Sequence, residues 1–201
     1  MSSKALIFDL DGTLYDKKHL ALRMVLRDLT HVRLMKLERS LRREFAGRPY
    51  ADKMSFYDAF LDELSRRSSR SRRYVEKWYF ENYKQNMVTI LTRHYKVCPW
   101  VKGEIERLHA EGRKVALLSD YGFVREKLQA IGLAAGHFDI IADAPSCGGL
   151  KPCSAPFLHI AHSLDLQPSE ITVVGDRADT DGAGAETCGM KFVDVKEYIK
   201  Y

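Results

Sequence analysis

The sequence lacks long hydrophobic runs. Within its 201 residues, no uninterrupted apolar stretch approaches the roughly 18 residues that a membrane-spanning helix needs. The start of the chain likewise has no apolar stretch long enough for a secretory signal, so we expect a cytoplasmic protein with no membrane partner. Hydrophobic residues nevertheless make up 45% of the chain, which is enough for one core domain carrying a smaller insert.

Cysteine is scarce, and its spacing does not suit metal or redox chemistry. The chain has four cysteines and no CxxC pair. A chain of this length does not need disulfide bonds to hold a core together. We therefore expect Cys98, Cys147, Cys153 and Cys188 to be free thiols.

The sequence also has no internal repeat and no long low-complexity tract.

Acidic residues are sparse in one part of the chain. The net charge is +5, but the segment from Asp16 to Tyr95 holds 19 Lys or Arg against 10 Asp or Glu, an excess of nine positive charges. The remainder holds 13 against 17 and is weakly acidic. Composition therefore divides the chain into a basic segment and an acidic remainder.

Four short apolar runs are typical of strands that are buried on both faces. They are ALIF (5–8), VALLS (115–119), FDIIA (138–142) and ITVVG (171–175). Apolar residues at helix spacing lie between these runs, for example Val124, Leu128 and Ile131. The alternation of strand and helix predicts an α/β fold with a Rossmann-like, doubly wound parallel sheet.

The basic segment breaks this alternation, because it has no clear strand run and shows helical apolar spacing. The spacing occurs at Leu22, Leu26 and Leu29, and again at Phe56, Phe60 and Leu64. We therefore predict a small all-α domain over residues 17–95, inserted after the first strand. Residues 1–16 and 96–201 would form the core domain.

Polar residues follow the predicted strands. They are Asp9, Asp11, Ser119, Asp120, Lys151, Asp176 and Asp181. Parallel strands end at one edge of a sheet, and ligands bind in the crevice outside that edge. We therefore expect carboxylates, a hydroxyl and one ammonium to meet there.

This set of groups suits phosphoryl transfer. A phosphate monoester brings about two negative charges, which carboxylates alone would repel. A divalent cation removes the conflict, and Mg²⁺ prefers oxygen ligands such as Asp9, Asp11 and Asp176. Lys151 and Ser119 could then hold the remaining phosphate oxygens.

Several of these residues also have a purely structural explanation. Gly12 and Thr13 could make the turn after the first strand. Asp179, Thr180 or Asp181 could cap the next helix. The occurrence of the whole set in strand order favours a functional site.

Four short motifs in the chain are similar to those of a known family. They are DLDGT (9–13), LLSD (117–120), LKP (150–152) and GDRADTD (175–181). In these motifs and their order, the chain resembles the haloacid dehalogenase superfamily of phosphatases. The resemblance covers nearly the whole predicted core and implies a Mg²⁺-dependent phosphatase that acts on a small phosphorylated substrate.

The resemblance also implies a role for each residue. Asp9 would be the nucleophile that forms an aspartyl-phosphate, and Asp11 would be the general acid and base. Ser119 and Lys151 would grip the transferring phosphoryl group. Asp176 would bind Mg²⁺ directly, together with the Asp9 side chain and the Asp11 backbone carbonyl.

Further assignments follow from the same resemblance. Asp181 would be a water-mediated metal ligand or a partner of Lys151. The substrate-binding residues would be Gly12, Thr13, Ser119, Asp120 and Lys151. The inserted segment would be a helical cap that closes over the site, with hinges near 15–18 and 95–99.

Other functions differ from this one in the residues that they need. A phosphomutase would use the same core residues, whereas a dehalogenase would not be expected to carry Asp11. A phosphonate hydrolase would need a reactive lysine from the cap, and no cap lysine stands out by position. A nucleic-acid-binding module could use the stretch RRSSRSRR (66–73), but nucleic acid is not the expected partner. The sequence sets no oligomeric state.

The aromatic stretch YVEKWYFENY (74–83) allows two interpretations. Its rings could stack on a nucleotide-like substrate, or they could form the interior of the cap, which their helical spacing favours.

Overall fold

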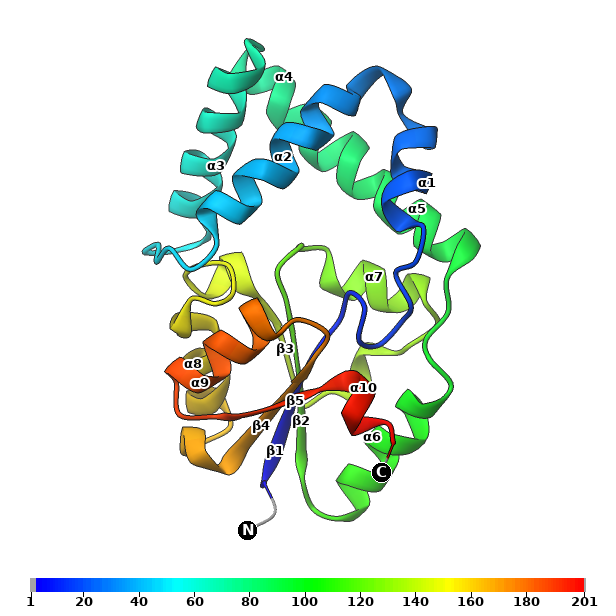
Figure 1. Cartoon of the computed structure of the whole chain (residues 1–201), viewed down its shortest axis with the longest axis vertical. Helices are drawn as coiled ribbons and strands as arrows, with labels where there is room; N and C mark the ends of the chain where they lie inside the picture. The colour runs from blue at the N-terminus through cyan, green and yellow to red at the C-terminus, as the bar shows by residue number, and fades with distance from the viewer. Residues whose placement is uncertain (1–2, 201) are drawn as a thin grey trace.

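The computed structural model describes residues 3–200, and within them a single parallel sheet has the strand order β3-β2-β1-β4-β5 (Figure 1). The strands are β1 (Ala5–Asp9), β2 (Lys114–Ser119), β3 (Ile140–Asp143), β4 (Ile171–Gly175) and β5 (Lys191–Asp194). The α/β fold class is confirmed, and the four predicted apolar runs all contain strands.

Two details of the sheet differ from the sequence prediction. The third strand begins at Ile140 because Phe138 closes a turn, in which its amide donates to the Ala135 carbonyl at 3.2 Å. The edge strand β5 was missed. Its residues are exposed or half-buried, so it lacks the continuous apolar run of a central strand.

Both faces of the sheet are covered, which explains the apolar runs. Leu6 and Phe8 point to one face and join the side chains of α6 and α7, while Ala5 and Ile7 point to the other and join α8 and α9. The core helices are α6 (Trp100–Ala110), α7 (Val124–Ala130), α8 (Ser154–Ser163), α9 (Ala183–Thr187) and α10 (Val195–Tyr198). The sheet is therefore doubly wound, as predicted.

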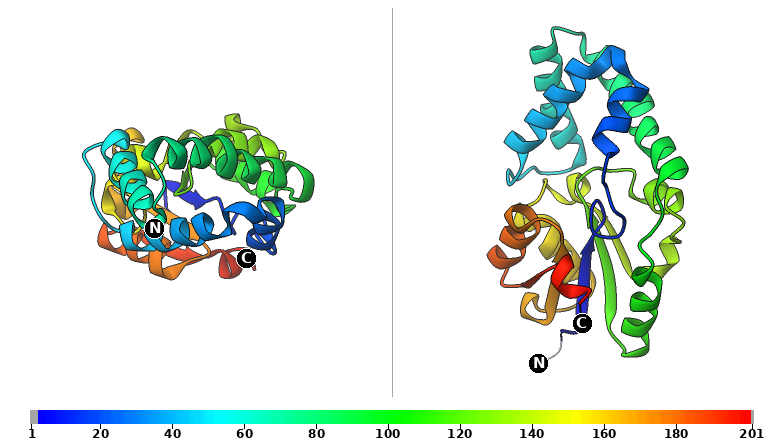
Figure 2. Two further views of the ribbon diagram at one scale, coloured as in Figure 1. Left: turned by 90° about the horizontal axis from the view of Figure 1, so that it is seen from above. Right: turned by 45° about the vertical axis from the view of Figure 1, so that its right-hand side comes forward.

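The remaining helices follow β1 and lie beyond the carboxyl ends of the strands (Figures 1 and 2). They are α1 (Leu20–Arg27), α2 (Val32–Phe45), α3 (Lys53–Ser68), α4 (Arg72–Lys77) and α5 (Gln85–His94), with a π-helical segment over Trp78–Lys84 between α4 and α5. The loop after α2 is hydrogen-bonded to the core, since the Tyr50 amide donates to the Gly148 carbonyl at 2.8 Å. The helical character of the insert is confirmed.

One apolar pattern in the insert formed a helix but not a core. Leu22, Leu26 and Leu29 are 55%, 64% and 66% exposed, although their spacing is helical. Helix α1 packs against α5 and buries Met24 instead, which leaves these leucines facing away. The pattern of Phe56, Phe60 and Leu64, by contrast, is fully buried.

The aromatic stretch and the basic stretch of the insert both make contacts within the protein. Trp78, Tyr79 and Tyr83 are buried and pack on one another, so the aromatic stretch forms interior structure. Three arginines of the basic stretch, Arg66, Arg67 and Arg72, form ion pairs with acidic neighbours. No helix in residues 3–200 is long and apolar enough to cross a membrane.

Candidate active site

Asp9 ends the central strand and lies at the middle of the carboxyl edge of the sheet. Its side chain is buried, one oxygen accepts a hydrogen bond from the Thr13 hydroxyl at 3.1 Å, and the other faces Lys151. The turn that returns Thr13 to Asp9 passes through Gly12 at φ +107°. A Cβ on Gly12 would lie 2.5 Å from an Asp176 carboxylate oxygen, so only glycine fits there.

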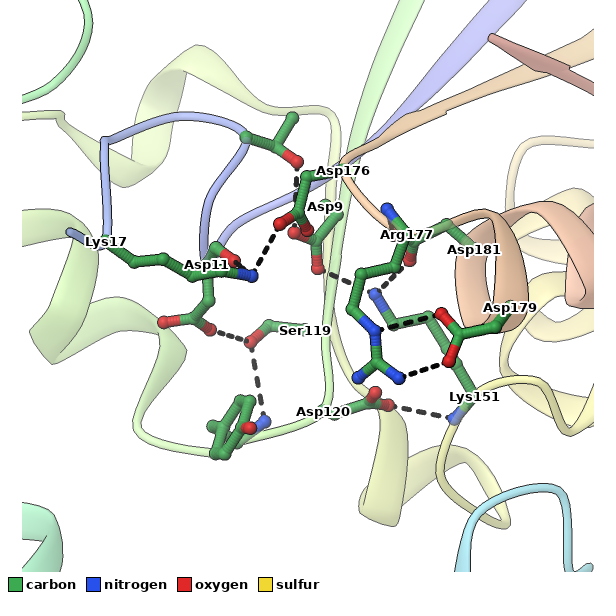
Figure 3. A network of polar contacts seen from close by, with 12 residues as sticks. Asp9, Asp11, Lys17, Ser119, Asp120, Lys151, Asp176, Arg177, Asp179 and Asp181 are labelled. Carbon is green, nitrogen blue, oxygen red and sulfur yellow. Dashed lines mark hydrogen bonds and ion pairs between the residues drawn. The ribbon is translucent and has the colours of Figure 1, made fainter. Parts of the chain in front are cut away.

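Lys151 connects two carboxylates that come from different strands. Its buried Nζ donates to Asp9 Oδ1 at 2.7 Å and to Asp181 Oδ1 at 2.6 Å (Figure 3). Burial alone would lower the pKa of Lys151, but Asp181 and Asp9 more than offset it and hold that pKa well above its usual value. Lys151 is therefore a permanent cation beside Asp9.

Asp11 lies two residues beyond Asp9 and has a different set of partners. Its Oδ2 accepts from the Ser119 hydroxyl at 3.1 Å and from the buried ammonium of Lys127, and its Oδ1 accepts from the Tyr15 hydroxyl. Burial raises the pKa of Asp11, but Lys127 outweighs burial and the pKa lies below its ordinary value. The two neighbouring acids are thus neutralised by separate lysines, Lys151 and Lys127.

Three carboxylates could hold a metal ion together. The side chains of Asp9, Asp176 and Asp181 each offer an oxygen, and these oxygens lie within 4.8 Å of one another. An all-oxygen, anionic donor set of this kind fits Mg²⁺. Of the predicted metal residues, Asp11 is the exception, because its carboxylate is outside this group.

The backbone carbonyl of Asp11 instead faces Lys17. The Lys17 Nζ donates to this carbonyl at 2.8 Å and lies 2.5 Å from Asp176 Oδ2 (Figure 3). An ammonium therefore already bridges two oxygens that the family resemblance gives to the metal. The sequence pattern around Lys17 does not predict this contact.

Asp120 stabilises the loop that carries Lys151. Its Oδ1 accepts from the Lys151 amide at 2.9 Å, and its backbone carbonyl accepts from Arg42 Nη1, on α2, at 2.9 Å. Burial raises the pKa of Asp120 above its ordinary value. Ser119, one residue earlier, points its hydroxyl at Asp11.

Asp181 is a partner of Lys151 and also closes a backbone turn. Its Oδ2 accepts from the Arg177 amide at 3.3 Å and so closes the turn at the start of the segment Ala178–Gly182, while Oδ1 holds Lys151. Burial raises the pKa of Asp181 to about 7, against the attraction of Lys151. The carboxylate packs directly on Gly175, where a Cβ would lie 2.4 Å from it.

The structure brings all the predicted site residues to one edge of the sheet. They are Asp9, Asp11, Gly12, Thr13, Ser119, Asp120, Lys151, Asp176 and Asp181. Sequence reasoning missed Lys17, Lys127, Tyr15 and Arg42. A signal existed for Lys127, which lies at helical spacing from Val124 and beside Leu128, on the apolar side of α7.

The chain matches a known family of hydrolases over most of its length. The family model of the haloacid dehalogenase-like hydrolases matches residues 3–189. The phosphoglycolate phosphatase of Aquifex aeolicus is 28% identical over 194 residues, which cover 94% of this chain and 82% of that protein. The phosphoglycolate phosphatase of Chromobacterium violaceum is 26% identical over 210 residues, which cover 96% and 84%.

Solved structures share the fold. A β-phosphoglucomutase from Clostridium difficile aligns with a TM-score of 0.67 at 22% identity, covering 100% of this chain and 88% of that one. A haloacid dehalogenase-type phosphatase from Thermococcus onnurineus aligns with a TM-score of 0.57 at 20% identity, covering 94% and 84%. The family match over most of the chain confirms the resemblance seen in the four motifs, and the chain belongs to the haloacid dehalogenase-like hydrolases.

Proposed function

We propose that this protein is a Mg²⁺-dependent phosphatase that hydrolyses a small phosphorylated metabolite through a phosphate ester on Asp9. The observation that carries the proposal is the position of Lys151, whose ammonium lies between Asp9 and Asp181. Asp176 lies at the same edge of the sheet, close to both carboxylates. This arrangement supports a carboxylate nucleophile that is held beside one fixed cation, Lys151, and beside a site for a second cation, the metal ion.

Asp9, Asp176 and Asp181 would hold the metal ion, with the Asp11 carbonyl as a further oxygen donor. When bound, Mg²⁺ would neutralise part of the phosphate charge and help to orient the phosphoryl group. The all-oxygen donor set described above supports this assignment.

The chemistry would proceed in two displacements. A carboxylate oxygen of Asp9 attacks phosphorus and the bond to the substrate oxygen breaks, while Asp11, in its protonated form, donates a proton to that leaving oxygen. Asp11 then takes a proton from water, which attacks the same phosphorus and releases phosphate and the Asp9 carboxylate. Ser119 and Lys151 would hold the phosphoryl oxygens during both steps.

We also propose that residues 17–95 act as a cap over the core formed by 1–16 and 96–201. The two connecting segments lie side by side, since the Tyr95 hydroxyl donates to the Lys18 carbonyl at 2.8 Å and the Cys98 amide donates to the Leu14 carbonyl at 2.8 Å. Paired connections of this kind are suited to a hinge that opens the site and closes it against water.

Turnover of p-nitrophenyl phosphate with and without Mg²⁺ tests the proposal. We expect hydrolysis that requires the metal and is abolished by Asp9→Asn, while Glu106→Gln, on the exposed side of α6, leaves it unchanged. Full activity of Asp9→Asn would overturn the nucleophile assignment.

Release of free phosphate separates a phosphatase from a phosphomutase, which would return the phosphoryl group to a second hydroxyl. Because two similar proteins are phosphoglycolate phosphatases, 2-phosphoglycolate is the first natural substrate to assay.

A further inference from the structure

Three buried cations surround the ring of Tyr121, two residues beyond Ser119. The guanidinium carbon of Arg42 lies 4.5 Å from the centre of this ring, and the ammonium groups of Lys84 and Lys127 lie 5.6 and 5.3 Å from it. Arg42 and Lys84 come from the inserted helices, whereas Lys127 comes from the core helix α7. Positive charge from both parts therefore converges next to the phosphoryl site.

Two of these cations have carboxylate partners. Arg42 contacts Glu38 through two of its nitrogens, at 2.7 and 2.9 Å, and Lys127 contacts Asp11. Lys84 is different, because within residues 3–200 no carboxylate lies within ion-pair distance of it. Its ammonium donates to the backbone carbonyl of Tyr121.

The surroundings of Lys84 do not compensate its charge. The side chain is only 1% exposed, and its ammonium lies 4.9 Å from the ring centre of Tyr79 and 6.0 Å from that of Tyr83. Burial and the nearby Arg42 lower the pKa of Lys84 well below its usual value, which Glu38 and Asp143 oppose only from a distance. A buried ammonium without a counter-ion is costly, and an arriving anion relieves that cost.

The position of Lys84 suits a group on the substrate rather than the transferred phosphate. The phosphoryl group has its own proposed partners in the core, Lys151 and Ser119. Lys151 lies beside Asp9 and Asp181, and Ser119 lies beside Asp11. The Tyr121 amide lies 3.5 Å from the Ser119 hydroxyl. Tyr121, whose carbonyl binds Lys84, is therefore only two residues from a residue of the phosphoryl site.

We propose that Lys84 binds an anionic group on the leaving part of the substrate, so that the enzyme selects phosphate monoesters carrying a second negative charge. The inference rests on the proposed phosphatase function and extends it to a substrate class. A carboxylate and a second phosphate would both satisfy Lys84. Because the ammonium is buried, such a substrate enters before the cap closes.

Matched substrate pairs test this assignment. We would measure kcat and KM for 2-phosphoglycolate against 2-hydroxyethyl phosphate, and for fructose 1,6-bisphosphate against fructose 6-phosphate. In Lys84→Met, the kcat/KM ratio within the preferred pair should fall about 10- to 100-fold, the size expected when a charged hydrogen bond is lost. Lys84→Arg should restore part of it. Lys77→Met is the matched control, because Lys77 precedes Lys84 by seven residues and its side chain is 71% exposed.

The outcomes separate the two proposals. A change confined to the first pair identifies a carboxylate, and one confined to the second identifies a phosphate. An equal loss on both members of each pair, or no preference for the doubly charged member in the wild type, overturns the role of Lys84 while the phosphatase function stands. Failure of the wild type to release phosphate from any of these four substrates, as well as from p-nitrophenyl phosphate, would overturn the phosphatase function itself. A thermal melt of Lys84→Met checks that the variant is folded.

Discussion

The ammonium of Lys151 lies 2.6 Å from a carboxylate oxygen of Asp181, and both side chains are almost completely buried. The same ammonium holds Asp9. Removing it in Lys151→Met would leave two buried carboxylates without their cation. Because breaking a buried ion pair by deleting one partner typically costs about 3–5 kcal/mol, we expect a large drop in the free energy of unfolding, measured by urea denaturation. Phosphatase activity should be lost as well.

The paired variant Lys151→Met/Asp181→Asn separates repulsion from loss of chemistry. Replacing one of the two carboxylates should recover part of the stability but none of the activity. If Lys151→Met alone were as stable as the wild type, the ion pairs with Asp9 and Asp181 would contribute nothing to folding, contrary to the buried contacts in Figure 3.

Gly12 should tolerate no side chain, because its backbone conformation and its close neighbours both exclude a Cβ. At Gly12→Ala, the new Cβ would lie 2.5 Å from Asp176 and 2.7 Å from Lys17, at a φ of +107°. We expect a loss of about 1–3 kcal/mol of stability and a marked loss of activity. In Gly103→Ala, within α6, the Cβ meets nothing within 4 Å, and this control should gain about 0.5–1 kcal/mol. Urea denaturation of both variants measures the contrast, and equal effects would contradict it.

The sequence was sufficient for four of the five strands and for the predicted residues at the carboxyl edge of the sheet. Continuous apolar runs exist because both faces of β1 are covered, and a polar residue at the end of such a run is conspicuous. The edge strand β5, half exposed, leaves no such pattern. Strand order then places Asp9, Ser119 and Asp176 together without any knowledge of side-chain contacts.

The counter-charges were harder to predict from the sequence. Lys127 lies on the apolar side of α7, but its pairing with Asp11 follows only from the way α7 packs on the core. Lys84 lies within an aromatic stretch, where the pattern predicts packing but not which charge is enclosed. Both contacts join residues more than 30 positions apart, so local spacing does not identify the partner of either lysine.

Lys127 should position Asp11 for proton transfer. Its ammonium and the Ser119 hydroxyl both bind Asp11 Oδ2, which fixes the orientation of the carboxylate. In Lys127→Met we expect kcat to fall by about tenfold or more, with a smaller change in KM, because the proton is moved in the transition state rather than in the bound substrate. Steady-state kinetics measure this, and Arg125→Met, on the exposed side of the same helix, is the control. A change in KM alone would instead indicate a role in binding.

Lys17 should compete with the metal for its oxygens. Its ammonium contacts the Asp11 carbonyl at 2.8 Å and Asp176 at 2.5 Å, so a cation binding to these oxygens has to displace it. In Lys17→Met, this competition is removed, and the Kd for Mg²⁺ should fall by about two- to fivefold, the range expected for a partly exposed ion pair. Calorimetric titration of the free protein with Mg²⁺ measures the change without reference to turnover. The neighbouring exposed Lys18→Met should bind Mg²⁺ as the wild type does. Weaker binding by Lys17→Met would mean that the ammonium organises these oxygens rather than competes for them.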